Sequence, residues 1–255
     1  FEDQISLSAH QKAADYTVAK GRFGRKENIY GVIILLVWTF GGGLALLSNA
    51  WDGLGLSSML TGVLFLLSFI VIGSLLDLPF SYYRTFVLED KFGFNRNTPA
   101  LFFSDFIKQT LLTLIMGALL IWVALWMMQS TGELWWLYLW AAWIGFALFM
   151  MWAYPAFIAP LFNKFTPLDD AALQQRVENL LARCGFKSQG IFVRDGSRRS
   201  GHGNAYFTGL GSNKRIVFFD TLLNTLNEDQ IEAVLAHELG HFRRKHVVKN
   251  MVVMA

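Results

Sequence analysis

The chain has 255 residues, of which 54% are hydrophobic and only 16% are charged, whereas about a quarter of the residues of soluble domains are charged. Its net charge of +3 comes from basic residues scattered beside apolar segments, which argues against nucleic acid as a partner and favours anionic lipid headgroups. The single cysteine, Cys184, excludes an internal disulfide and a cysteine metal cluster. Composition therefore predicts a membrane protein.

Four stretches contain no Asp, Glu, Lys or Arg, and each is long enough to cross a bilayer as a helix of about 20 residues. They predict a juxtamembrane basic segment over residues 1–29, then four transmembrane helices within residues 30–163, with a loop at 78–108 between the second and third. The expected helical cores are 31–47, 59–76, 111–128 and 135–154. The glycines at 41–43 predict either a loosened first span or a close helix contact.

The basic residues also predict an orientation. Lysines and arginines precede the first span and occupy the 78–108 loop, whereas the short loops at Asp52 and Glu133 carry none. The segments that carry the basic residues face the cytoplasm by the positive-inside rule. An even number of spans returns residues 164–255 to the same side. We therefore expect a multi-pass protein, of the bacterial inner membrane or an equivalent internal membrane, with residues 164–255 in the cytoplasm.

Residues 164–255 predict a small domain of mixed structure. Apolar residues recur at helical spacing over 173–184, and Gly185 follows as a helix C-cap. Strands are expected over 190–194, 205–210 and 215–219, in a small antiparallel sheet. Asn227 and Gln230 predict a capping box for a helix that runs to at least His246. The apolar run at 247–254 would begin a fifth span.

This last helix carries the residues that predict chemistry. His237, Glu238 and His241 form a His-Glu-x-x-His pattern, in which both imidazoles lie one turn apart on one helix face and can reach one Zn²⁺ ion. Zinc suits two neutral imidazoles, a carboxylate and an open water position. Glu238 is placed to accept a proton from water, as a general base must. The alternative is that both histidines only form hydrogen bonds within a helix near the membrane.

Further segments, in order along the chain, give a resemblance to a family. The sequence resembles the type I CAAX prenyl endopeptidases, which are integral-membrane zinc peptidases of the Ste type (gluzincins). The matching segments are KFGFN at 91–95 with Asp105, IAPLFNKFTPL at 158–168, RSGHGNAYF at 199–207, KRIVFFDTL at 214–222 and HELGH at 237–241.

The resemblance implies a mainly α fold, with a helical barrel around a water-filled chamber and a small α+β zincin-like domain. It implies that residues Asn204, Ala205, Tyr206 and Phe207 pair with an extended substrate, with His202 either lining the same groove or stabilising a turn. Family members have seven membrane helices and a third zinc ligand, a glutamate downstream of the last two. No residue here matches that glutamate, so we expect a fragment that is inactive alone.

Three functions remain open at this point. The first is a zinc endopeptidase acting on membrane-associated or CAAX-type polypeptides. The second is a quality-control gluzincin that cuts membrane proteins without needing a prenyl group, and the third is a non-catalytic membrane scaffold. The residues do not indicate the natural substrate or the oligomeric state.

Overall fold

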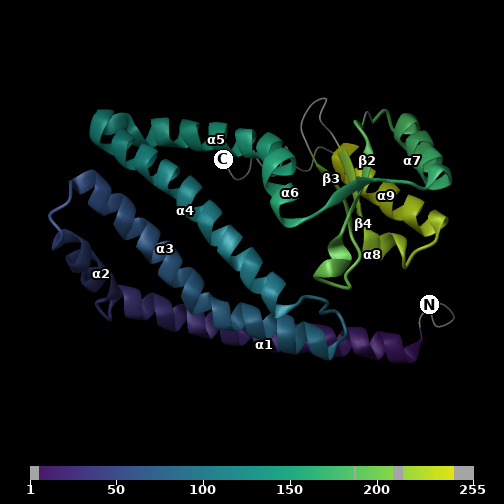
Figure 1. The fold of residues 1–255 in the computed structure, drawn as a ribbon, viewed down its shortest axis with the longest axis horizontal. Coiled ribbons are helices and arrows are strands. Elements are labelled where there is room, and N and C mark those ends of the chain that lie inside the picture. The colour runs from purple at the N-terminus through teal and green to yellow at the C-terminus, as the bar shows by residue number, and fades with distance from the viewer. Residues whose placement is uncertain (1–5, 187, 209–214, 244–255) are drawn as a thin grey trace. The chain divides into compact units, whose positions relative to one another are not determined.

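The computed structural model describes residues 6–186, 188–208 and 215–243, most of which are helical (Figure 1). The chain divides into two compact units, Phe1–Trp136 and Leu137–Ala255. The sequence predicted a domain boundary at residue 164, which this division into compact units does not test, and the boundary stays a prediction.

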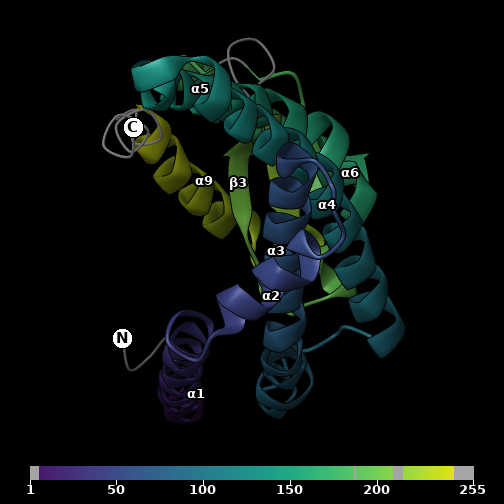
Figure 2. The same cartoon turned by 90° about the vertical axis from the view of Figure 1, so that its left-hand side faces the viewer.

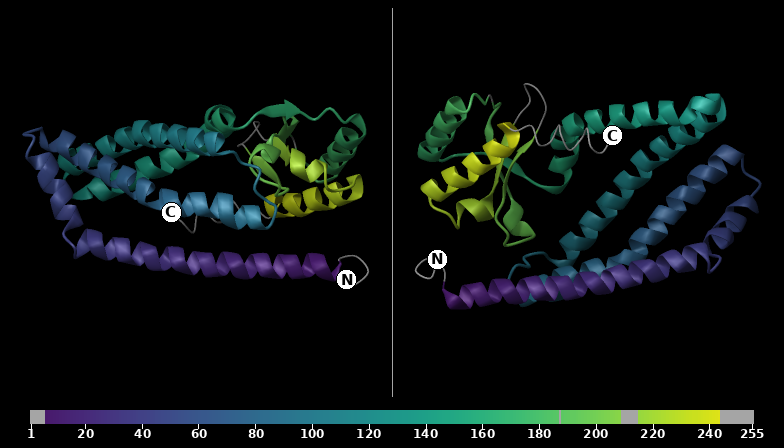
Figure 3. Two further views of the ribbon diagram at one scale, coloured as in Figure 1. Left: turned by 60° about the horizontal axis from the view of Figure 1, so that its bottom comes forward. Right: turned by 180° about the vertical axis from the view of Figure 1, so that it is seen from behind.

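The first unit is built from long helices (Figure 3). Ser6, Ser57 and Thr98 cap three of them, each accepting a hydrogen bond from the backbone N–H three residues on, as an N-cap does. The elements are α1 (Leu7–Thr39), α2 (Gly43–Asp52), α3 (Ser58–Tyr83), a π-helix η1 (Arg84–Glu89), α4 (Pro99–Ser130) and a short 3-10 turn η2 (Gly132–Leu134).

The glycine triplet interrupts the first predicted span. α1 and α2 meet at a bend of 50°, and Gly42 at the break has a φ of +79°, which a residue with a Cβ atom rarely adopts. The loosened span is thus the correct one of the two predicted alternatives.

The described helices have the length and apolarity of membrane spans. Three qualify, Ser58–Glu89, Pro99–Ser130 and Gly132–Phe162, and the bent pair of α1 and α2 brings the number to as many as four. Large apolar side chains face outward on them, with Ile115 70% and Leu119 63% exposed. Such surfaces require lipid, which confirms an integral membrane protein.

The second unit joins the end of the last long helix to a small sheet. Its elements are α5 (Trp135–Ala153), a π-helix η3 (Tyr154–Ile158), α6 (Ala159–Phe162), β1 (Phe165–Pro167), α7 (Ala171–Arg183), β2 (Ile191–Arg194), η4 (Gly196–Arg198), β3 (Ala205–Thr208), β4 (Arg215–Phe219), α8 (Asp220–Leu223) and α9 (Glu228–Arg243). The C-terminal cap predicted for α7 is confirmed, because Gly185 has a φ of +66° and Phe186 N–H donates to the Leu181 carbonyl at 2.9 Å, as in a Schellman motif.

The sheet has four strands in the order β1-β2-β4-β3. β1 and β2 are antiparallel, β2 and β4 are parallel, and β3 and β4 are antiparallel. The prediction of a three-stranded antiparallel sheet was therefore wrong in two respects. It missed β1, a strand of only three residues, and it gave all pairs an antiparallel orientation, whereas β2 and β4 are parallel.

The core of this unit lies between one face of the sheet and the helices α7, α8 and α9. Ile216 and Phe218 from β4 are fully buried, and Val177 and Leu235 from α7 and α9 are 1% exposed. This core fixes α9 against the sheet.

Candidate functional site

Helix α9 begins where the capping box predicts. Asn227 N–H donates to Oε1 of Gln230 at 3.0 Å, and Gln230 N–H donates to Oδ1 of Asn227 at 2.9 Å. The pair satisfies N–H groups that the first turn of a helix leaves without partners. The predicted continuation to His246 and the fifth span fall outside the described residues.

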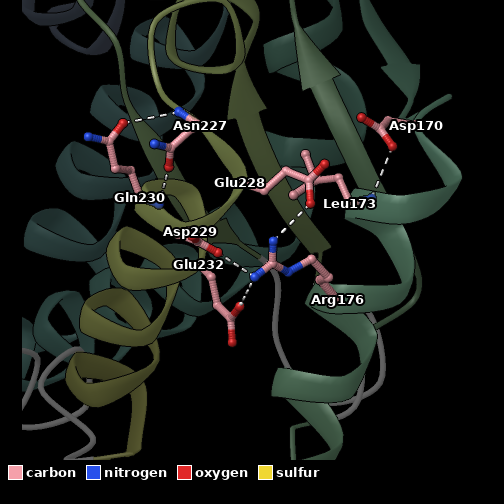
Figure 4. A network of polar contacts seen from close by, with 8 residues as sticks. All are labelled: Asp170, Leu173, Arg176, Asn227, Glu228, Asp229, Gln230 and Glu232. Atoms are coloured by element: carbon pink, nitrogen blue, oxygen red, sulfur yellow. Dashed lines mark hydrogen bonds and ion pairs between the residues drawn. The ribbon is translucent and has the colours of Figure 1, made fainter.

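An arginine on α7 also holds the first turns of α9 (Figure 4). The Arg176 guanidinium donates to Glu228 at 2.8 Å and to Asp229 at 2.5 Å, and it lies 3.3 Å from Glu232. This arrangement raises the pKa of Arg176, chiefly through the hydrogen bond to Glu228. It also places the acidic residues at the helix N-terminus, where the helix dipole favours negative charge.

One face of α9 packs into the core, and the other carries the residues predicted to bind the metal and to act as base. Leu235 and Leu239 are buried, whereas His237 is exposed and Glu238 is half-buried. Residues four apart share a helix face, so the backbone of α9 places His241 on the face of His237. The side chain of His241 lies outside the described part of the chain.

Strand β3 runs beside α9 (Figure 2). It forms one edge of the sheet, because it pairs only with β4 among the described strands. Phe219 N–H donates to the Asn204 carbonyl at 2.9 Å, and hydrogen-bonded pairs alternate along an antiparallel ladder. The backbone groups of Ala205 and Phe207 are therefore the ones that point to the open edge.

The predicted substrate-binding residues have different surroundings. The side chains of Ala205 and Phe207 pack into the core, and Tyr206 points to the opposite face of the sheet, where its ring meets Phe219 edge-on. Burial raises the pKa of Tyr206, while the nearby Arg194 guanidinium opposes the rise. Asn204 Oδ1 accepts a hydrogen bond from Ala205 N–H at 2.9 Å. This backbone N–H at the sheet edge therefore already has a partner within the chain.

His202 lies in a turn before β3. Its N–H donates to Ser200 Oγ at 3.2 Å, and its carbonyl accepts a hydrogen bond from Thr221 Oγ1 at 2.9 Å. The imidazole is exposed. The backbone contacts are those of a turn, and the groove role of His202 stays a prediction.

The donor set fits part of a zinc site. His237 and His241 supply two imidazoles one helical turn apart, and His237 is exposed, as a ligand that a metal can reach must be. Across the residues described, no three His, Cys, Asp or Glu side chains gather into a cluster that could hold a metal ion. The chain therefore supplies two candidate protein ligands, His237 and His241.

These features define a class: a polytopic membrane protein with a small α+β domain whose sheet-backed helix carries the His-Glu-x-x-His pattern. Comparison with known families identifies the family within this class. Residues 1–164 match the family described as CAAX prenyl protease N-terminal, five membrane helices, and residues 167–255 match peptidase family M48. The chain therefore belongs to the CAAX prenyl protease family of M48 peptidases.

Similar proteins cover the length of the chain. The CAAX prenyl protease 1 homolog of Oryza sativa is 42% identical over 89% of the chain and 53% of its own length. CAAX prenyl protease 1 of Saccharomyces cerevisiae is 39% identical over 100% of the chain and 58% of its length. The crystal structure of S. mikatae Ste24p superposes with a TM-score of 0.92 at 39% identity, covering 99% of the chain and 60% of that structure. The chain thus spans somewhat more than half the length of these relatives.

Proposed function

We propose that this protein is an integral-membrane zinc metalloendopeptidase, in which His237 and His241 hold the metal and Glu238 is the general base. The observation that carries the proposal is the position of the His-Glu-x-x-His helix α9 beside the edge strand β3. Zinc bound there would polarise a peptide carbonyl and lower the pKa of a bound water to about 7. A third ligand would come from outside the described residues.

The side chains of this chain have separate tasks in that reaction. The Glu238 carboxylate takes the proton from the attacking water and returns it to the leaving amine. His237 and His241 would hold the metal through their imidazole nitrogens. The edge-facing carbonyl of Ala205 and the edge-facing backbone groups of Phe207 pair with the main chain of an extended substrate, a mode that tolerates varied side chains. We keep Asn204, Tyr206 and His202 as candidate substrate contacts.

We further propose membrane-associated or CAAX-type polypeptides as substrates. The names of the rice and yeast relatives support this substrate class, and the apolar helices keep the site close to membrane-anchored chains. The positive-inside pattern supports an active site facing the cytoplasm. The relatives named above are eukaryotic and give no support to a bacterial inner membrane, so the proposal concerns orientation alone.

The test is to measure zinc content and cleavage of a CAAX-type peptide in the natural, full-length protein. We expect Glu238→Gln to keep its zinc and to lose cleavage by about 10²–10⁴-fold, the usual contribution of a general base. His237→Ala should lose both zinc and cleavage. Glu178→Gln, the same change on the exposed surface of α7, is the matched control and should behave as the wild type.

Three outcomes would contradict the proposal. Equal cleavage by Glu238→Gln and wild type removes Glu238 from the mechanism. A folded protein that holds no zinc supports the scaffold alternative. Equal cleavage of membrane proteins that carry no prenyl group supports the quality-control alternative.

A further inference from the structure

A cavity of about 430 Å³ lies on the face of the sheet opposite the packed core. All four strands contribute to it, and the turn of chain through η3 and α6 closes it. Its volume is in the range of sites that bind small organic groups. Most of the lining is apolar, with Phe165, Phe192 and Val217 contributed by the strands.

The charged side chains among the described lining residues are both basic. Lys164 and Arg215 line it, and no Asp or Glu is among its described lining residues. In the part of the chain that the structure describes, neither cation forms a salt bridge. Arg215 instead lies over the Phe192 ring at 5.4 Å. The cavity therefore offers positive charge to an anion.

Backbone contacts fix the position of Lys164. Its N–H donates to Oδ1 of Asp195 at 2.7 Å, and its carbonyl accepts from Asp195 N–H at 3.2 Å. The other carboxylate oxygen of Asp195 pairs with Arg198 at 3.3 Å. Asp195 thus holds the backbone of Lys164 while its charge is shared with a different cation.

A third cation, Arg194, interacts with a residue that lines the cavity. Arg194 stacks over the Phe219 ring at 4.7 Å and interacts with Tyr206, which lines the cavity. Its Nε is buried without a hydrogen-bond partner among the described residues, and an unsatisfied buried donor is costly. This group adds to the positive potential at the same face.

The wall formed by Tyr154 to Pro160 belongs to the candidate span Gly132–Phe162, and Lys164 is the first charged residue after the uncharged stretch 134–163. Tyr154 is half exposed, with 52% of its surface accessible, and tyrosine favours the level of the lipid headgroups. The cavity therefore lies where an apolar helix passes from membrane to water.

From these observations we infer that the cavity binds the phosphate headgroup of an anionic phospholipid. Lys164 and Arg215 face the phosphate, and the hydroxyl groups of Tyr206 and Thr208 are available as hydrogen-bond donors. The apolar lining receives the first carbons of the lipid. This site lies on the face of the sheet opposite the packed core, and of the candidate substrate contacts it includes Tyr206 alone among its described lining residues. It does not depend on the proposed peptidase activity.

The test measures lipid retained by the natural protein in neutral detergent, by native mass spectrometry with added phosphatidic acid or with phosphatidylcholine of the same acyl chains. We expect preferential retention of phosphatidic acid. Lys164→Gln should weaken it about fivefold, and Lys164→Gln combined with Arg215→Gln about 25-fold, since each basic residue near an anionic lipid contributes about one fivefold step. Arg183→Gln, which removes an exposed charge from α7, should have no effect.

Lys164 is exposed, so the single variant should fold even if the double variant does not, and thermal unfolding checks both. Equal retention of phosphatidic acid by Lys164→Gln and wild type would overturn the inference, as would equal retention of phosphatidylcholine. Inorganic phosphate that binds as tightly as phosphatidic acid would identify a free-anion site instead. Displacement of the lipid by an acidic peptide at equal concentration would identify a peptide site and overturn the lipid assignment.

Discussion

Asn227 and Gln230 bind each other reciprocally, each backbone N–H donating to the side chain of the other at 3.0 and 2.9 Å. His237 lies about 2.8 turns after Asn227 along α9, at 3.6 residues per turn, so the start of the helix sets the register of the candidate ligands. Loss of the box should destabilise the second unit without changing the residues proposed for chemistry.

We therefore expect Asn227→Ala to lower the free energy of unfolding by about 1 kcal/mol, the usual contribution of an N-cap. Asn227→Ser retains an oxygen acceptor and should be close to the wild type. Hydrogen exchange of the α9 backbone amides in increasing urea, followed by mass spectrometry, measures both. Equal losses for the alanine and serine variants would show that the side-chain acceptor does not stabilise the helix.

Local signals in the sequence were sufficient for much of the second unit. The start of α9, the C-terminal cap of α7 and the bounds of β4 depend on residues within a few positions of one another, and all three predictions are confirmed. The sheet order depends on pairing between distant segments. β1 pairs Phe165 with Arg194, and three residues ending in proline carry too little periodicity to predict a strand.

The same distinction applies to the sites. His237, Glu238 and His241 were predicted because their spacing along one helix specifies their common placement. The cationic cavity was missed because Lys164, Tyr206 and Arg215 are brought together only by the sheet topology. The one available signal was Lys164, the first charge after a long apolar stretch.

The ion pairs of Arg176 with α9 should make the contact between α7 and α9 sensitive to salt. Arg176→Gln removes the pairs with Glu228, Asp229 and Glu232, so the unfolding midpoint should fall at low ionic strength. At 1 M salt the Debye length is about 3 Å, and the difference from wild type should shrink. Arg183→Gln, on the same helix, controls for the loss of a charge. A deficit in Arg176→Gln that is independent of salt would assign the effect to packing of the side-chain stem.

Gly62 allows α3 and α4 to approach each other. A Cβ atom at Gly62 would lie 2.8 Å from Cδ1 of Leu125, whereas one at Gly73 on the same helix would meet nothing within 4 Å. Small residues commonly permit such close packing between membrane helices. We expect Gly62→Ile to cost about 1–3 kcal/mol through overpacking, and Gly73→Ile to cost less. Thermal unfolding in detergent compares the two, and equal midpoints would contradict the close contact.

Tyr206 should make the unfolding free energy fall at high pH. Burial raises its pKa above the ordinary value of about 10, so the hydroxyl is protonated in both states below that pH. As the pH rises past 10, the unfolded chain loses the proton first, which favours unfolding until the folded state also ionises. The stabilisation is thus complete below pH 10 and is lost as the pH approaches the folded pKa.

Tyr206→Phe removes this ionisation, and it should show a smaller decline in unfolding free energy between pH 9 and 11 than the wild type. Other tyrosines and lysines titrate in the same window in both proteins, so the difference between the two curves isolates Tyr206. Curves that stay parallel across this range would mean that the hydroxyl ionises equally well in the folded and unfolded chains. In that case water reaches the Tyr206 hydroxyl at the cavity wall as freely as it does in the unfolded state.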